Sequence, residues 1–213
     1  MCSKVYQTVA SLVFAMCVSL SFPAISAPLK LVVLGDSLSA GYQLAPQDAF
    51  PAKLQVALAE RGHDVEVINA GVSGDTSSGG LSRLDWSVGP DVGAVVLELG
   101  ANDALRGLPP ETTRDNLNEI VRRLSERGVD VLIAGMLAPR NLGDEYAAAF
   151  DPIFADIAKT HDSLLYPFFL EGVAMNPDLN LADGMHPTGA GVSVIVENVL
   201  PKVEELIARA NGP

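Results

Sequence analysis

Ser37 follows a short apolar run, in a setting where its hydroxyl could act as a nucleophile. Residues 31–34 read Leu-Val-Val-Leu, a pattern typical of a strand that is buried on both faces. Gly35 and Asp36 separate this run from the serine, and open α/β sheets bind ligands at the carboxyl ends of their strands. A serine placed there could attack an acyl carbon if a base took its proton. Alternatively, Asp36 or Ser37 only caps a helix.

The base for such a serine can be sought by elimination, because the chain has only three histidines. His63 and His161 each follow a predicted helix and precede a predicted strand, so we expect capping or solvated roles at the opposite sheet edge. His186 lies in an irregular stretch from which the chain can reach the carboxyl edge. Asp183, three residues earlier, could accept a hydrogen bond from the imidazole and fix its tautomer. An Asp-Gly turn before a helix that starts near Pro187 would explain the same residues without chemistry.

Three groups could stabilise the oxyanion that such an attack creates. They are the backbone amide of Ser37, the amide of Gly71, which carries no side chain, and the side-chain NH₂ of Asn102. Glycine and asparagine are also ordinary turn residues. Their joint placement after three successive predicted strands favours the chemical interpretation.

Alternating strands and helices would position these residues. The strands are expected at residues 31–34, 65–70, 94–99, 129–135 and 164–166. The helices are expected at residues 48–61, 77–86, 112–127, 144–160 and 189–210. Asp48 is expected to cap the first helix, and Pro201 to kink or split the last. This alternation predicts a single α/β domain over residues 27–213 with a mostly parallel sheet, whose first three βα loops meet at one edge.

The composition excludes several classes of partner. The 213 residues are 48% apolar and 19% charged, which is typical of a globular chain with a sizeable core. The formal net charge is −12, from 14 basic and 26 acidic residues. Nucleic acids and anionic membranes are therefore not expected as partners, because both are bound through basic patches.

Residues 1–26 read as a secretory signal peptide. Lys4 supplies a positive charge, residues 9–20 are apolar but too short to span a bilayer comfortably, and small residues lead to a cleavage site after Ser26. We therefore expect a protein that is exported to the periplasm or secreted by a bacterium, without stable membrane insertion after signal removal. An uncleaved anchor is the alternative.

Both cysteines, Cys2 and Cys17, lie within this segment. The mature protein is therefore expected to have no disulfide, no thiol nucleophile and no thiolate metal site. Lipidation at Cys17 is a further possibility for the N-terminus, although Met16 is bulky where a lipoprotein signal has a small residue.

Four blocks of the sequence resemble the GDSL, or SGNH, hydrolases in their order and spacing. They are Gly35-Asp36-Ser37-Leu38, Asn69-Ala70-Gly71-Val72-Ser73-Gly74-Asp75-Thr76, Gly100-Ala101-Asn102-Asp103 and Asp183-Gly184-Met185-His186-Pro187. Residues 100–107 and 166–172 look most similar to the bacterial multifunctional thioesterase, lysophospholipase and arylesterase branch.

This resemblance implies a fold and a catalytic apparatus. The implied fold is a flavodoxin-like three-layer α/β/α sandwich around a mostly parallel five-stranded sheet. The implied catalytic residues are Ser37, Asp183 and His186, with Ser37, Gly71 and Asn102 forming the oxyanion hole. No metal or organic cofactor is expected.

The resemblance also implies a substrate pocket and a role for Asp36, which would shape the turn through backbone hydrogen bonds. By position, residues 75–80 resemble the mobile loop of that branch, and 105–110 and 137–141 its pocket walls. The residues expected to contact substrate are Asp75, Leu105, Leu108, Leu137 and Pro139.

The predicted function is hydrolysis of carboxylic esters and thioesters through an acyl-Ser37 intermediate. Expected substrates are small acyl compounds: aryl esters, short-to-medium-chain esters, acyl-CoA or lysophospholipids. A carbohydrate acetylesterase would use the same catalytic residues, and a periplasmic binding protein without activity could share the fold. The protein is expected to be a monomer.

Overall fold

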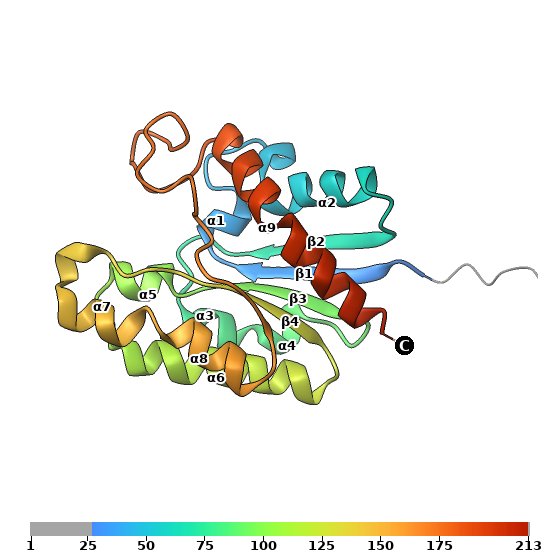
Figure 1. The fold of residues 1–213 in the computed structure, drawn as a ribbon, viewed down its shortest axis with the longest axis horizontal. Coiled ribbons are helices and arrows are strands. Elements are labelled where there is room, and N and C mark those ends of the chain that lie inside the picture. The colour runs from blue at the N-terminus through green and yellow to red at the C-terminus, as the bar shows by residue number, and fades with distance from the viewer. Residues whose placement is uncertain (1–26, 213) are drawn as a thin grey trace, which may run out of the picture.

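Five parallel strands form the centre of the fold in the computed structural model, which describes residues 27–212 (Figure 1). They are β1 (Leu29–Gly35), β2 (Val65–Gly71), β3 (Ala94–Glu98), β4 (Asp130–Ala134) and β5 (Leu164–Tyr166). Their order is β2-β1-β3-β4-β5, and every neighbouring pair is parallel. This is the flavodoxin-like doubly wound order, which changes direction between β1 and β3. The predicted fold class is therefore confirmed. The predicted signal peptide lies outside the described residues.

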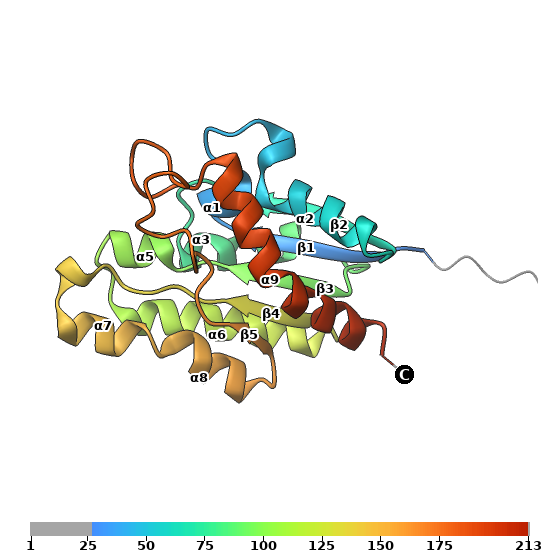
Figure 2. The same ribbon diagram turned by 45° about the horizontal axis from the view of Figure 1, so that its top comes forward.

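Helices cover both faces of the sheet (Figures 1 and 2). One face is covered by α2 (Phe50–Glu60) and α9 (Gly189–Ala210). The other face is covered by α3 (Ser77–Ser82), α4 (Leu84–Ser87), α6 (Pro110–Glu126) and α8 (Ile153–Thr160). The remaining short elements are α1 (Ser37–Ala40), α5 (Ala101–Leu105), α7 (Asp144–Phe150), and the 3₁₀ helices η1 (Pro46–Asp48) and η2 (Arg140–Leu142).

The core lies between the sheet and these two layers. Residues 31–34 of β1 and 94–97 of β3 are at most 1% exposed, as the apolar runs predict for strands covered on both faces. Phe50 at the start of α2 packs edge-to-face against Phe169, with ring centroids 5.0 Å apart. Central strands buried in this way form a rigid base for the loops at their carboxyl ends.

Two predicted helices are each interrupted. The predicted helix over 77–86 is divided at Arg83 into α3 and α4. The predicted helix over 144–160 is divided into α7 and α8 at Asp151 and Pro152. Proline has no N–H to donate to the preceding turn, which explains the second break.

The ends of three other helices also differ from prediction. α2 begins at Phe50 without a side-chain cap, and Asp48 instead forms an ion pair with Lys53, 3.1 Å from Oδ1 to Nζ. α6 begins at Pro110, because proline suits the first turn of a helix. α9 runs through Pro201 without being split.

His63 and His161 lie in the turns before β2 and β5, away from the site described below. His63 Nε2 lies 3.1 Å from Glu204 Oε1 on α9, and His161 follows α8 as its C-cap, 2.8 Å from Asn118 Oδ1. Both positions agree with the predicted edge of the sheet. Within residues 27–212, no helix is long and apolar enough to cross a membrane.

Candidate active site

Ser37, His186 and Asp183 form a connected chain of hydrogen bonds. Ser37 Oγ lies 2.9 Å from His186 Nε2, and His186 Nδ1 lies 2.8 Å from Asp183 Oδ2. Ser37 is the first residue of α1, directly after β1, and the other two residues come from the loop before α9. The structure thus brings together the three predicted catalytic residues, which are separated by up to 149 positions in the sequence.

Asp183 is held as a carboxylate that orients the imidazole. Its Oδ1 accepts hydrogen bonds from the backbone N–H groups of His186 and Met185, at 3.0 and 2.9 Å. These two bonds, with the His186 side chain adding to them, lower the pKa of Asp183 to about 2. An ionised Asp183 accepts a hydrogen bond from Nδ1–H, so Nε2 is left with a lone pair that faces the Ser37 hydroxyl.

The loop that carries His186 is fixed by Asn180, which was not among the predicted site residues. Asn180 is 7% exposed, and its Nδ2 donates to the carbonyls of Val173 and Asn176, at 2.7 and 2.8 Å. Its backbone pairs with Pro187 in an isolated antiparallel bridge. No motif or periodicity marks this residue in the irregular stretch, so its sequence gives no signal of the role.

Asp36 joins the nucleophile turn to the loop after β3. Its Oδ1 accepts a hydrogen bond from Leu38 N and its Oδ2 one from Asn102 Nδ2, both at 2.9 Å. Asn102 is the second residue of α5, and Gly100 before it has φ +114°. Burial raises the pKa of Asp36 to about 6, although the bonds from Leu38 and Asn102 oppose that rise. The first bond fits the predicted role in shaping the turn, and the second was not predicted.

A second buried carboxyl, Glu98, lies beneath this turn. Glu98 is 0% exposed at the end of β3, and its Oε2 accepts hydrogen bonds from Ser39 Oγ at 2.7 Å and from Asp36 N at 3.3 Å. A Cβ on Gly35 would lie 2.6 Å from the same oxygen, so only glycine leaves room for this contact. Oε1 has no partner among the described residues. Burial, and then the nearby Asp36 carboxylate, hold the pKa of Glu98 well above its usual range.

Glu98 is expected to make the protein less stable as pH rises. The pKa of Glu98 in the folded state lies above the usual 4.5. Above that pH the folded state therefore binds more protons than the unfolded state, and the free energy of unfolding falls as the pH rises. The melting temperature of Glu98→Gln should therefore fall less than that of the wild type between about pH 5 and about pH 8. Thermal unfolding across this range tests the prediction, with Glu60→Gln on the exposed side of α2 as control. An unchanged pH dependence in Glu98→Gln would contradict it.

Gly71 does not have the free amide predicted for an oxyanion donor. It is the last residue of β2, and its N–H donates to Asn69 Oδ1 at 2.9 Å. A Cβ on Gly71 would overlap the backbone N of Ala40, so this glycine allows α1 to pack against β2. Gly74, later in the same loop, has φ +85°, and its N–H has no acceptor among the described residues. Of these two glycine amides, only that of Gly74 therefore has no acceptor within the described part of the chain, and the position of Gly74 in the glycine-rich block was the available signal.

The Ser37 amide and the Asn102 side chain each have an N–H hydrogen that could be donated to an oxyanion. No acceptor for Ser37 N–H is found among residues 27–212, because its position begins α1. Asn102 Nδ2 uses one hydrogen on Asp36 and retains a second. Both residues line the same cavity as His186.

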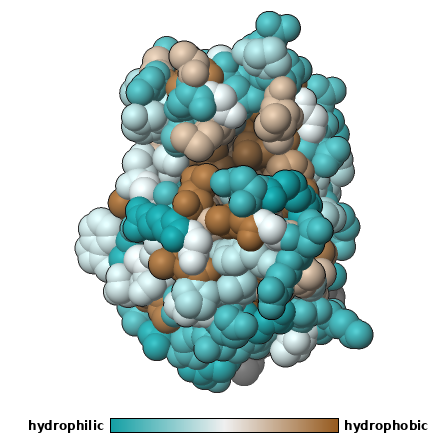
Figure 3. All heavy atoms as spheres, turned by 90° about the vertical axis from the view of Figure 1, so that its left-hand side faces the viewer, coloured by the Kyte–Doolittle hydropathy of each residue, from teal (hydrophilic) through white to brown (hydrophobic). Residues whose placement is uncertain are grey.

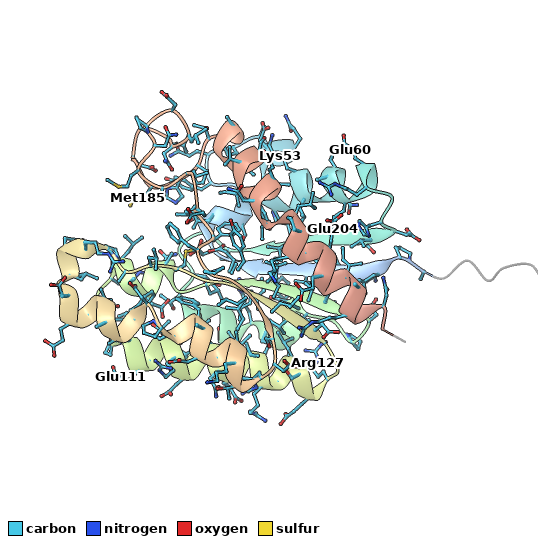
Figure 4. All side chains as sticks on the ribbon, viewed as in Figure 1. Lys53, Glu60, Glu111, Arg127, Met185 and Glu204 are labelled. Atoms are coloured by element: carbon cyan, nitrogen blue, oxygen red, sulfur yellow. The ribbon has the colours of Figure 1, made fainter. Side chains whose placement is uncertain are left out.

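This cavity opens beside Ser37 and has a volume of about 520 Å³. Ser37, Asn102 and His186 lie on its wall, which is otherwise mostly apolar. The apolar side chains are Leu38, Ala101, Leu105, Met136, Leu137, Pro139, Phe168, Leu170, Ala174, Met175 and Met185. Figure 3 shows hydrophobic residues gathered around a hollow on this face, and Figure 4 places Met185 on the loop before α9. The size is within the usual range for small-molecule pockets.

Three of the five predicted substrate-contacting residues line the cavity: Leu105, Leu137 and Pro139. Asp75 and Leu108 do not. Asp75 Oδ2 pairs with Arg83 Nε at 2.6 Å, and the carbonyl of Leu108 accepts a hydrogen bond from the Tyr146 hydroxyl at 2.7 Å. Both residues are therefore hydrogen-bonded elsewhere and lie off the wall of this cavity.

Arg83, the ion-pair partner of Asp75, also binds the ends of two strands. Its guanidinium also donates to the carbonyls of Ala70 and Gly35, at 2.7 and 2.9 Å. Arg83 thus ties the carboxyl ends of β1 and β2 together, and Asp75 neutralises it.

Residues 27–212 contain no group of three or more His, Cys, Asp or Glu side chains that could hold a metal ion.

The sequence and the fold are both similar to those of known hydrolases. The sequence matches the GDSL-like Lipase/Acylhydrolase family over residues 33–194. It is 42% identical over 180 residues to an arylesterase of Vibrio mimicus, covering 83% of this chain and 88% of the relative. It is 36% identical over 195 residues to thioesterase 1/protease 1/lysophospholipase L1 of Escherichia coli K12, covering 91% and 92%. The crystal structure of AlinE4, an SGNH-hydrolase family esterase, matches with a TM-score of 0.72 and 41% identity, covering 87% of this chain and 100% of that one.

The matched segment begins within β1 and ends within α9, so it includes Ser37, Asn102, Asp183 and His186. It includes the end of β1, all of β2 to β5 and the loops at the carboxyl edge of the sheet. The chain belongs to the GDSL-like lipase/acylhydrolase family.

Proposed function

We propose that this protein hydrolyses acyl esters and thioesters through an acyl-enzyme on Ser37. As a member of this family, with relatives named as an arylesterase and a thioesterase/lysophospholipase, it is a carboxylic ester hydrolase. The observation that carries the mechanism is the Ser37–His186–Asp183 chain, with 2.9 and 2.8 Å between its side-chain atoms, at the wall of an apolar cavity.

The proposed reaction has two steps. His186 Nε2 takes the proton of Ser37, whose Oγ attacks the acyl carbon, while Asp183 stabilises the imidazolium that forms. The tetrahedral intermediate collapses, and the leaving alcohol or thiol takes the proton from His186. A water molecule, deprotonated by His186, then attacks the acyl-Ser37 ester and releases the acid.

The proposed oxyanion hole combines one side chain and two amides. The Ser37 amide and the second hydrogen of Asn102 Nδ2 are free donors. The Gly74 amide is proposed in place of the Gly71 amide, which already binds Asn69. Such donors act when they are held in place before the charge develops. The bond between Asn102 and the buried Asp36 supports this preorganisation.

The apolar cavity supports an acyl chain as the group bound next to Ser37. Burial of each methylene contributes up to about 0.8 kcal/mol, which is about fourfold in affinity. We therefore expect kcat/KM to rise along p-nitrophenyl acetate, butyrate, hexanoate and octanoate until the cavity is filled. Acyl-CoA and lysophospholipid, tested beside these esters, would identify the leaving groups accepted.

Leu137→Ser should weaken the preference for octanoate over acetate by roughly fivefold, because Leu137 lines the cavity and its side chain is large and apolar. Val56→Ser is the matched control, since Val56 is exposed on α2 and does not line this cavity. Equal turnover of all four esters would contradict an acyl-binding cavity. Faster hydrolysis of acetylated sugars than of any acyl ester would favour a carbohydrate acetylesterase instead.

The remaining expectations concern location and partners. The signal-like segment over residues 1–26 supports export to the periplasm or secretion, and the net charge of −12 argues against nucleic acid as a partner. The substrate is a small-molecule ester, and a monomer with Ser37, Asp183 and His186 in one chain would be sufficient for activity.

A further inference from the structure

Tyr42 covers one face of the His186 imidazole. The two ring centroids lie 4.4 Å apart and the ring planes are tilted by 38°. Ser37 and Asp183 bind the ring nitrogens of His186, at its edge, and leave its faces free. Tyr42 therefore packs against a part of the imidazole that these two hydrogen bonds do not use.

Tyr42 is fixed in place by the same short helix that presents Ser37. The N–H groups of Gly41 and Tyr42 both donate to the carbonyl of Ser37, each at 3.2 Å. Gly41 adopts φ +83°, and a Cβ there would lie 2.6 Å from Ala49 Cβ, so the chain can turn here only because residue 41 is glycine. The nucleophile and the Tyr42 backbone thus belong to one rigid turn, whereas His186 comes from a different part of the chain.

The ring of Tyr42, and not its hydroxyl, makes the contact. The hydroxyl has no hydrogen-bond partner within residues 27–212, and the side chain is 39% exposed. Tyr42 also does not line the cavity beside Ser37. A role in binding the acyl chain or in a polar network is therefore not supported by its contacts.

We propose that Tyr42 is a positioning residue that keeps the His186 imidazole aligned with Ser37 and stabilises the imidazolium formed during acyl transfer. This inference rests on the proposed function, in which His186 carries a positive charge after it takes the serine proton. The face of an aromatic ring attracts a cation at this distance. The stabilisation arises only once the imidazolium has formed, so it lowers the barrier to the chemical step and leaves substrate binding unchanged.

The test replaces Tyr42 with phenylalanine and with leucine, using p-nitrophenyl butyrate as substrate. Tyr42→Phe keeps the aromatic face and should keep kcat within about twofold. Tyr42→Leu should lower kcat by on the order of fivefold and leave KM unchanged. Tyr42→Met serves as a second non-aromatic variant if the leucine protein does not fold. Trp86→Leu, at an aromatic residue 86% exposed on α4, is the matched control and should have wild-type kinetics.

Reaction with a fluorophosphonate separates this inference from the function on which it rests. Tyr42→Leu should be phosphonylated at Ser37 more slowly than the wild type by a similar factor. Equal rates of phosphonylation and equal kcat in the two proteins would overturn the role of Tyr42 while leaving the function intact. Tyr42→Phe as slow as Tyr42→Leu would also overturn it, as would a change in KM alone. A wild-type protein that is not phosphonylated would overturn the proposed function itself.

Discussion

Ser37→Ala is expected to lower kcat on p-nitrophenyl butyrate by on the order of 10⁶-fold. The substitution removes the oxygen that would form the acyl-enzyme, and the apparatus left behind can only orient water and polarise the ester. Ser37 lies at the wall of the cavity with its hydroxyl bonded only to His186. Its loss should therefore leave the fold intact, and circular dichroism and thermal unfolding would verify this.

Steady-state kinetics on the purified mature protein measures this effect. Ser193→Ala is a matched control, because Ser193 Oγ donates only to the carbonyl of Gly189 on the exposed side of α9. That variant should keep wild-type kcat. A folded Ser37→Ala protein that retained a tenth or so of the wild-type kcat would show that another group is the nucleophile.

Asn102→Ala should lower kcat by on the order of 10²-fold and change KM little. The substitution removes the side-chain donor proposed for the oxyanion, which is needed more in the transition state than in the bound ester. It also removes the hydrogen bond of 2.9 Å to the buried Asp36. Loss of that bond should raise the pKa of Asp36 further, since the bond lowers it in the wild type.

The control for this variant is Asn198→Ala, whose Nδ2 donates to the carbonyl of Glu171 from the exposed side of α9. It should keep wild-type kcat and lose only modest stability. Asn102→Ala with kcat within error of the wild type would exclude Asn102 from the oxyanion hole. A large rise in KM with unchanged kcat would indicate that it binds the substrate in the ground state instead.

The strands and the catalytic side chains could be predicted because their signals are local. Residues 31–34 and 94–97 are apolar runs, and their burial on both faces follows from the helices that alternate with them. His186 could be selected because the chain has so few histidines and because parallel strands place their loops at one edge.

Other features depend on contacts between distant residues, which no local pattern encodes. Glu98 lies at the end of an apolar strand, where the sequence predicts that a charged residue is exposed. In the structure it is 0% exposed, beneath Asp36 and Ser39. The N–H of Gly71 donates to the side chain of Asn69. This bond depends on the direction of the Asn69 side chain, which the motif that contains both residues does not specify. Asn180 acts through carbonyls in an irregular segment that has no periodicity.

Covalent labelling tests the central claim, that Ser37 is an activated nucleophile, most directly. Wild-type protein treated with a fluorophosphonate should gain the mass of one phosphonyl group, and peptide mapping should place it on Ser37. Ser37→Ala should gain none, and His186→Ala should react far more slowly because the base is missing. Labelling of a different residue, or an unlabelled wild-type protein that still hydrolyses esters, would contradict the account.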